Sequence, residues 1–92
     1  MVKQVNASHI LVKTEQEANV TLYDVMHGRS FEDVAKERSI CPSSKKGGNL
    51  GWFGRNQMVK EFENAAFSTP KGQLIKVKSQ FGWHIIKVID TQ

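Results

Sequence analysis

Residues 81–88 read FGWHIIKV, a run that sets one histidine among β-branched, aliphatic and aromatic side chains. Such residues favour β-strands, so we expect a strand here. A second run of this kind, ASHILV at residues 7–12, lies near the other end of the chain and also holds one histidine. Alternate residues of a strand share a face, so His9 and Leu11 would lie on the same side. We therefore expect His84 and His9 to mark a polar site over an apolar floor.

The stretch between these two runs contains SICPSSKKGGNLGWF at residues 39–53, which includes the only cysteine, Cys41. Residues 41–48 are too rich in Pro, Ser and Gly for a regular element, so we expect a loop there. The apolar segment at residues 50–53 is short enough for an interior strand. A loop that leads into a strand is thus predicted in the middle of the chain.

Three helices are expected in the connecting segments. Thr14 followed by Glu17 has the form of a capping box, and apolar residues then recur at helical spacing until Gly28. Ser30 and Asn56 are residue types that cap helix N-termini, and each precedes a further apolar stripe. The expected helices run over about residues 15–27, from Ser30 to near Ser39, and from Asn56 to about Phe67.

The end of the chain predicts two more strands, near residues 74–78 and 83–89, joined by a hairpin turn at residues 79–82. The expected order is strand, helix, helix, strand, helix, strand, strand, with one more helical turn around residues 38–41. This order is typical of an α+β fold rather than a parallel α/β fold. With 92 residues, the chain is expected to form a single domain over residues 1–92.

Composition narrows the setting in which this domain would act. Hydrophobic residues make up 39% and charged residues 24% of the chain, which is ordinary for a folded protein. No segment approaches the roughly 20 apolar residues of a membrane span, and the first four residues lack the apolar stretch of a signal peptide. One cysteine cannot form an internal disulfide, so a cytoplasmic location is expected. The net charge of +4 rests on dispersed lysines, which form either a solvated surface or a site for an anionic partner.

Five segments of the sequence resemble the parvulin family of peptidyl-prolyl cis/trans isomerases. They are residues 7–12, 39–43, 48–53, 57–59 together with Phe62, and 81–86. They follow the family's order and span nearly the whole chain, and the ICPS form at residues 40–43 looks most like small stand-alone parvulins of bacteria and archaea. The resemblance implies a four-stranded antiparallel sheet surrounded by three to four helices, in the order βα3βαβ2.

The resemblance also implies a site without a metal or a cofactor. Four polar residues match the family's catalytic positions, namely His9, Cys41, Ser79 and His84. Five apolar residues match the positions that take or border the substrate proline ring, namely Leu11, Leu50, Met58, Phe62 and Phe81. The implied function is isomerisation of X-Pro bonds in proline-containing polypeptides by a monomer that assists protein folding.

The sequence differs from the phosphate-specific parvulins between the first strand and the first helix. Those members carry an arginine-bearing loop between the first strand and the first helix, whereas here only Lys13 precedes the helix start. Position 40, acidic in some relatives, is Ile40, which removes a charge beside Cys41. We therefore expect apolar or basic residues before proline to be accepted, with no requirement for phosphate.

The reaction itself explains such a mixture of residues. Amide resonance sets a rotation barrier of roughly 18–20 kcal/mol, and X-Pro bonds isomerise unaided in tens to hundreds of seconds. The twisted amide has lost conjugation at nitrogen, so no bond needs to break. An apolar slot and polar groups that favour the twisted form suffice. A thousandfold acceleration requires roughly 4 kcal/mol of such preference.

Other interpretations of these residues stay open at this stage. The two histidines can be structural residues that hydrogen-bond each other, and His27, beside Gly28, suits a helix C-terminus rather than catalysis. Cys41 invites a nucleophile model, or a zinc site with His9 and His84, although no close ligand spacing supports a metal. Helical spacing of Met58 and Phe62 is also what a core stripe shows, and the glycines at positions 47, 48 and 51 lack the motif of a phosphate loop.

Two functions of other classes compete with isomerisation. A binding module would hold proline-containing or unfolded segments in the same apolar pocket without important turnover, as a chaperone does. A lysine-rich surface would instead bind an anionic membrane or a nucleic acid weakly, with isomerisation secondary or lost. Neither a nucleic acid nor a membrane span is required by the sequence.

Overall fold

The computed structural model describes residues 2–92, which form four strands, three α-helices and one 3-10 helix. In chain order these are β1 (Gln4–Val12), α1 (Glu15–Met26), α2 (Phe31–Arg38), η1 (Pro42–Lys46), β2 (Asn49–Gly54), α3 (Lys60–Ser68), β3 (Leu74–Ser79) and β4 (Gly82–Thr91). The α+β class and the order βα3βαβ2 are therefore confirmed, with η1 as the third helix after β1. Within the described residues, none of the helices has the length and apolar character needed to cross a membrane.

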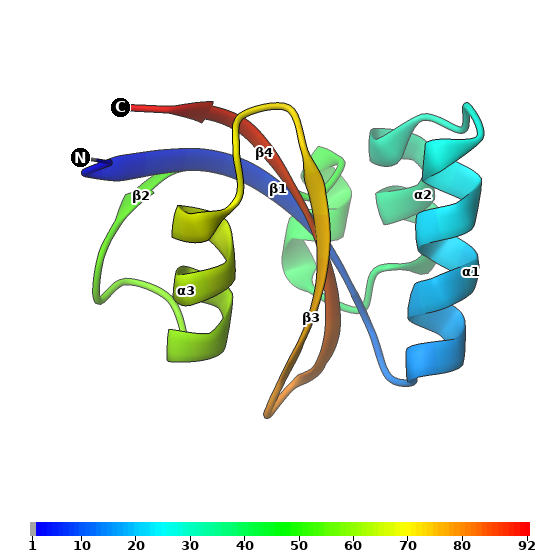
Figure 1. The fold of residues 1–92 in the computed structure, drawn as a ribbon. Helices are drawn as coiled ribbons and strands as arrows, with labels where there is room; N and C mark the ends of the chain where they lie inside the picture. Colours follow the sequence, from blue (N-terminus) through cyan, green and yellow to red (C-terminus); the bar gives the residue numbers. More distant parts are fainter. Residues whose placement is uncertain (1) are drawn as a thin grey trace.

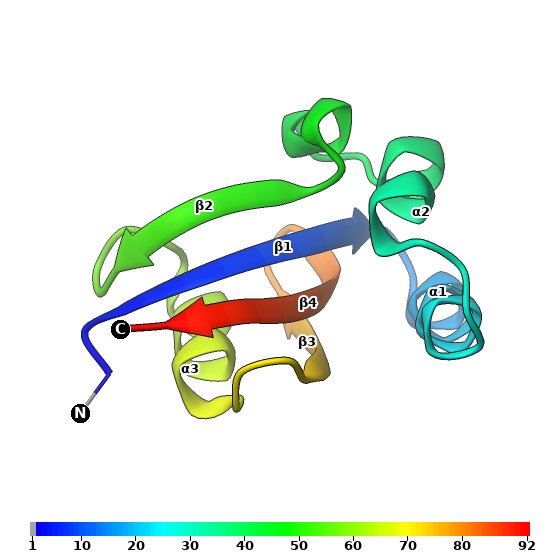
Figure 2. The same cartoon turned by 90° about the horizontal axis from the view of Figure 1, so that it is seen from above.

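The strands form one antiparallel sheet in the order β2-β1-β4-β3, which Figure 2 shows from above. The two strands that carry histidines, β1 and β4, are thus the central pair. Their register places Leu11 opposite His84 and His9 opposite Ile86. His9 and His84 are therefore diagonal neighbours on the same face of the sheet.

Helices cover both faces of the sheet, so the fold has three layers (Figure 1). On one face α3 closes a core formed by Val5, Ala7, Phe53, Phe62, Ala65, Ala66, Ile86 and Val88. On the other face α1 and α2 close a core formed by Ile10, Val12, Ala18, Phe31, Val34, Ala35 and Ile85. Because neighbouring strand residues point to opposite faces, β1 and β4 contribute to both cores. His9 and His84 belong to the face that α3 covers.

The predicted ends of the first two helices are confirmed. Thr14 is the N-cap of α1, and its side chain accepts the backbone N–H of Glu17 at 3.2 Å. Ser30 is the N-cap of α2 and accepts the N–H of Asp33 at 3.4 Å. Gly28, just beyond α1, has φ +107° and ends the helix as expected.

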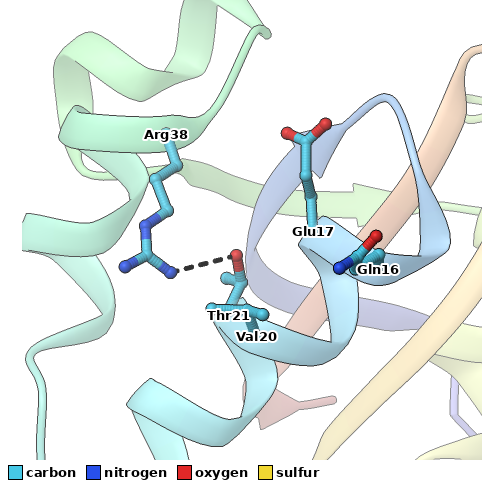
Figure 3. A pocket seen from close by; sticks show the side chains of 5 residues that line it. All are labelled: Gln16, Glu17, Val20, Thr21 and Arg38. Atoms are coloured by element: carbon cyan, nitrogen blue, oxygen red, sulfur yellow. Dashed lines mark hydrogen bonds between the residues drawn. The ribbon is translucent and has the colours of Figure 1, made fainter.

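Arg38 joins α1 to α2. Its guanidinium lies 2.7 Å from the Asp24 carboxylate and donates to Thr21 Oγ1 at 3.4 Å, as Figure 3 shows for Thr21. A shallow depression over this junction is lined by Gln16, Glu17, Val20, Thr21 and Arg38. The Arg38 guanidinium in its wall is already bound by Asp24 and Thr21. This depression therefore belongs to the contact between α1 and α2, and not to the histidine site on the opposite face of the sheet.

The prediction that Asn56 caps the third helix was wrong. The helix α3 begins at Lys60, and its N-cap, Val59, makes no side-chain capping bond. Asn56 instead has φ +69°, a left-handed conformation that asparagine tolerates better than most residues. The residue therefore serves a turn in the loop between β2 and α3.

The predicted loop at residues 41–48 and the extra helical turn at residues 38–41 also needed correction. The turn lies later, at Pro42–Lys46, inside the expected loop. Pro42 at its first position has a φ that is preset for a helix start, and Gly47 in the left-handed conformation ends it. A short 3-10 segment thus forms where a count of Pro, Ser and Gly alone predicts irregular chain.

Gly48 allows the chain to enter β2 directly beside the first histidine. Its φ is +84°, and a Cβ atom at this position would overlap the His9 carbonyl oxygen. The Gly48 carbonyl accepts the His9 N–H at 2.9 Å, next to a register shift between Ala7 and Ser8. The absence of a side chain at Gly48 is therefore a condition for this placement of the His9 backbone.

Replacing Gly48 by alanine should lower the free energy of unfolding by roughly 3 kcal/mol, because left-handed strain and a backbone clash add together. The matched control is Gly72→Ala, since Gly72 has φ +86° but an added Cβ atom would meet nothing within 4 Å. The control should lose roughly 1 kcal/mol, the strain alone. Chemical denaturation of both variants measures the difference, and equal losses would contradict the close approach to His9.

Candidate active site

The two histidine side chains lie in direct contact. His9 Nδ1 is 3.1 Å from His84 Nδ1, the ring centroids are 5.3 Å apart and the ring planes differ by 17°. Both residues are buried, with 5% and 3% of their surface exposed. The diagonal register of β1 and β4 therefore places the two imidazoles within hydrogen-bond distance of each other.

Phe62 provides the apolar surface against which both imidazoles pack. Its ring centroid lies 5.3 Å from each imidazole centroid, at interplanar angles of 84° to His9 and 82° to His84. Edge-to-face contacts of this kind are favourable for aromatic rings. Phe62 is itself buried in α3 and packs on Phe53 at 5.8 Å. The expected apolar floor is thus an α3 side chain that packs on the sheet.

Ser79 extends the polar chain at the far side of His84. Its Oγ lies 2.6 Å from His84 Nε2, and it accepts the backbone N–H of Phe81 at 3.2 Å. Ser79 sits at the end of β3 and pairs with Gly82 across the two-residue turn. A continuous line of hydrogen bonds therefore runs from the Phe81 amide through Ser79 and His84 to His9.

Two proton arrangements satisfy this line when both imidazoles are neutral. If His84 Nδ1 donates to His9, then the Ser79 hydroxyl donates to His84 Nε2. If His9 Nδ1 donates to His84, then His84 Nε2 donates to Ser79, and the serine proton is free for another acceptor. In both arrangements His9 Nε2 is buried and has no partner among the described residues. The second arrangement leaves a bare acceptor there, whereas the first leaves an N–H.

Both histidines are neutral near pH 7. Burial, and secondarily the neighbouring His84, lower the pKa of His9 from 6.5 to about 4. Burial also lowers the pKa of His84, and the nearby Glu61 carboxylate opposes this shift. The desolvated imidazoles therefore present hydrogen-bonding groups without a net charge.

A cavity of about 470 Å³ opens over this floor. Its wall is formed by His9, Leu11, Ile40, Cys41, Pro42, Leu50, Met58, Val59, Phe62, Phe81 and His84. Eight of the nine site residues predicted from the sequence are in this wall, and Ser79, the ninth, is bonded to His84. The structure thus brings together residues from all four strands, η1, α3 and three connecting segments.

The sequence-based prediction missed three wall residues, Ile40, Pro42 and Val59. Pro42 follows Cys41 and Val59 follows Met58, so both lie inside the matched segments at residues 39–43 and 57–59, and assigning the neighbours of each predicted site residue to the wall would have found them. Ile40 differs from the acidic residue of some relatives, and the sequence alone does not place it in the wall. The residue is 52% exposed, as is typical of a rim rather than of a core.

Ser39 orients this rim, a role that its place in the matched segment at residues 39–43 did not indicate. Its Oγ accepts the N–H of Leu11 at 3.0 Å and the N–H of Cys41 at 3.4 Å. The Ile40 N–H in turn donates to the Leu11 carbonyl at 2.9 Å. Residues 39–41 therefore continue the pairing of β1 where β2 no longer accompanies it, and they place Ile40 and Cys41 beside Leu11.

The structure also bears on the zinc site, the Cys41 thiol and His27. Within residues 2–92, no group of three or more His, Cys, Asp or Glu side chains is arranged to hold a metal ion, so the zinc alternative lacks a ligand set. Cys41 is a free, partly buried thiol in the cavity wall. His27 is the C-cap of α1, and its Nδ1 lies 2.8 Å from the Tyr23 carbonyl oxygen, away from the cavity.

Comparison with known proteins places the chain in a family. A family model described as "PPIC-type PPIASE domain" matches residues 1–92. The chain belongs to the parvulin, or PPIC-type, family of peptidyl-prolyl cis/trans isomerases. The resemblance inferred from five short segments is therefore confirmed, together with the parvulin fold.

Parvulin relatives include longer proteins and small ones. Foldase protein PrsA 1 of Bacillus cereus is 51% identical over 89 residues, which cover 95% of this chain and 31% of the relative. The crystal structure of PrsA from Bacillus anthracis superposes with a TM-score of 0.96 at 41% identity, covering 99% of this chain and 43% of that one. NmPin, the parvulin of Nitrosopumilus maritimus, superposes with a TM-score of 0.88 at 42% identity, covering 98% and 99%. The chain spans about a third of the length of the curated PrsA relatives.

The buried imidazoles of this parvulin should make its stability depend on pH. His9 has a lower pKa in the folded state (about 4) than in the unfolded state (6.5), so the unfolded state binds more protons between these values. The contribution of His9 to the free energy of unfolding is therefore complete above pH 6.5 and is lost as the pH falls toward 4. We expect the free energy of unfolding to drop by roughly 2 kcal/mol from pH 7 to pH 5 through His9.

Urea denaturation at the two pH values measures this drop. The control is His9→Gln, which removes this titrating group and should reduce the drop, leaving the part that comes from His84. An unchanged pH dependence in the folded variant would show that His9 is not buried in its neutral form.

Proposed function

We propose that the chain catalyses cis/trans isomerisation of X-Pro bonds in polypeptides by a non-covalent mechanism, and that it assists protein folding. The observation that carries the proposal is the apolar cavity placed against two hydrogen-bonded, neutral imidazoles. Membership of the parvulin family supports the reaction, and the foldase names of the PrsA relatives support the folding role.

The chemistry favours an environment of low polarity. In the planar amide, resonance gives the carbonyl oxygen negative charge and the nitrogen positive charge. In the twisted amide this separation is lost, and the nitrogen lone pair is localised. A cavity that excludes water therefore destabilises the planar form more than the twisted form, and a donor near the nitrogen stabilises the twisted form further.

The proline ring would occupy the apolar part of the cavity. Leu50, Met58 and Phe62 would contact the ring, and Leu11 would close the side toward β1. The ring's shape is nearly the same in both isomers, so it can stay fixed while the preceding residue rotates. Holding the ring thus restricts the motion to the bond that must turn.

The polar groups would lie along the rotating carbonyl. His84 and Ser79 are linked at 2.6 Å, and His9 stabilises this pair from the other side at 3.1 Å. Cys41 supplies a polarizable sulfur in the same wall. The histidines would orient the site, and their protons can take either of the two arrangements described above. None of these roles requires a covalent bond to the substrate.

The residue before proline would meet an apolar rim. Ile40 and Phe81 border the cavity, and these residues are 52% and 56% exposed. The first strand runs into α1 through a tight turn with one basic residue, Lys13, so an arginine-bearing phosphate loop is absent from residues 13–14. An apolar residue before proline should therefore be preferred to a phosphorylated one.

Catalytic amounts of the protein should accelerate cis/trans exchange of a Leu-Pro peptide by at least about a thousandfold at saturation, equivalent to ~4 kcal/mol of transition-state preference. The phosphoserine-Pro counterpart should respond less, because residues 13–14 carry no arginine to pair with the phosphate. Exchange spectroscopy by NMR measures both rates on peptides of otherwise identical sequence. Titration of the same peptides gives their affinities.

The two measurements separate isomerisation from its rivals. Binding of Leu-Pro without faster exchange would favour the binding module, and no effect on either peptide would contradict the proposed enzyme. A stronger response of the phosphoserine peptide would overturn the specificity and would indicate that lysines act as a clamp.

Cys41→Ser should keep at least about a tenth of the wild-type kcat/KM, a loss of no more than ~1.4 kcal/mol, because the sulfur acts by local polarity. Abolished activity in a folded variant would support the nucleophile model instead. Mass spectrometry of the wild-type protein mixed with substrate distinguishes the two mechanisms, since a nucleophile would form an adduct.

Several features stay predictions. They are a cytoplasmic location, a monomeric state, a single domain over residues 1–92 and weak binding of anionic surfaces through the lysines. The lysines Lys71 and Lys76 are paired with Asp90 and Glu15, which leaves fewer cations for an anionic partner.

A further inference from the structure

Glu63 is a buried carboxylate for which the proposed reaction has no use. It lies in α3 one residue after Phe62, and only 7% of its surface is exposed. Its Oε1 accepts the backbone N–H of Asn56, and its Oε2 lies 3.1 Å from Arg55 Nη1. A buried carboxylate is costly unless such partners compensate it, so this arrangement needs a reason.

The partners of Glu63 belong to the loop between β2 and α3. This loop, residues 55–59, carries Met58 and Val59, which are both in the cavity wall. It has little regular structure of its own, because Asn56 is left-handed and α3 begins without a side-chain cap. Its position must therefore be set by contacts with neighbouring elements.

Glu63 supplies the most buried side-chain hydrogen-bond acceptor among these contacts. Its carboxylate holds the first two residues of the loop, and Arg55 also lies 4.5 Å from the centre of the Phe67 ring. At the β2 end, the Gly54 N–H donates to Gln57 Oε1 at 2.9 Å. Since Phe62 and Glu63 are neighbours on one helix, the loop with Met58 is fastened to the same rigid element that provides the floor.

We propose that Glu63 is a positioning residue for the proline pocket: it holds the loop of residues 55–59 so that Met58 and Val59 face the ring site above Phe62. This inference rests on the proposed isomerase function. It assigns a role in shaping the pocket to a charged side chain that is not part of the cavity wall and is hydrogen-bonded to Arg55 and Asn56.

The kinetic consequence follows from what the pocket holds. Contacts to the proline ring are the same in the planar and the twisted amide, because the ring itself does not rotate. Loss of such uniform contacts raises KM and leaves kcat unchanged, whereas loss of contacts to the carbonyl lowers kcat. A displaced Met58 loop therefore has a signature that differs from damage to His84 or Ser79.

Glu63→Gln is the variant that tests this role. The amide keeps the size of the side chain but has only one acceptor oxygen, so its NH2 group must face either the Asn56 N–H or the Arg55 guanidinium, and the two bonds of the carboxylate compete for the remaining oxygen. We expect KM for a Leu-Pro peptide to rise about tenfold, or ~1.4 kcal/mol, with kcat unchanged. Hydrogen exchange at the Asn56 amide should become at least about tenfold faster in the same variant.

The matched control is Asp24→Asn, which breaks the partly buried Asp24–Arg38 pair on the opposite face of the sheet. It should lower Tm without changing KM. A folded Glu63→Gln protein with wild-type KM would overturn the inference, and so would an equal rise of KM in the control.

Failure of the inference is distinguishable from failure of the proposed function. If the wild-type protein does not accelerate exchange, the function itself fails. If Glu63→Gln does not fold, Arg55→Met replaces it, since Arg55 is largely exposed and the Asn56 bond to Glu63 is kept. That variant should raise KM about threefold, or ~0.7 kcal/mol, with kcat unchanged. A wild-type KM would contradict the role of the loop.

Discussion

The hydrogen bond between the His9 and His84 rings is the contact on which the rest of the site depends. It forms only when β1 and β4 are neighbours and when Leu11, not His9, stands opposite His84. A shift of one residue in this register would turn one imidazole to the face covered by α1 and α2. The central position of the two strands and the close approach of Gly48 to His9 both serve this register.

Burying two imidazoles requires compensation, and the surrounding structure provides it. Each ring loses water and gains an aromatic edge contact with Phe62, and the pair shares one Nδ1 contact. Ser79 satisfies the outer nitrogen of His84, whereas His9 Nε2 has no partner among the described residues. The low pKa of His9 reflects this balance, because a neutral ring needs less solvation than a charged one. The result is a polar but uncharged site, which suits an amide that becomes less polar as it twists.

Local patterns predicted much of the fold. Strand periodicity, the Thr14 and Ser30 caps and Gly28 located the first three elements, because these signals act within a few residues. The candidate site followed from motif resemblance, and the structure brings all nine residues together. Ile40, Ser39 and Glu63 were not predicted, since their roles arise from contacts with segments far away in the chain or in a loop. Asn56 was misread for the same reason: the left-handed turn is stabilised by a carboxylate seven residues later, and not by a helix that starts at Asn56.

The most direct test of the site is a ¹⁵N-labelled titration with an unlabelled Leu-Pro peptide, followed residue by residue. We expect the changes in chemical shift to concentrate on the cavity wall, with the largest at Leu11, Cys41, Met58 and Phe81, and little change along α1. A response centred on α1 and α2 would contradict the assignment, because these helices cover the opposite face of the sheet from the paired histidines.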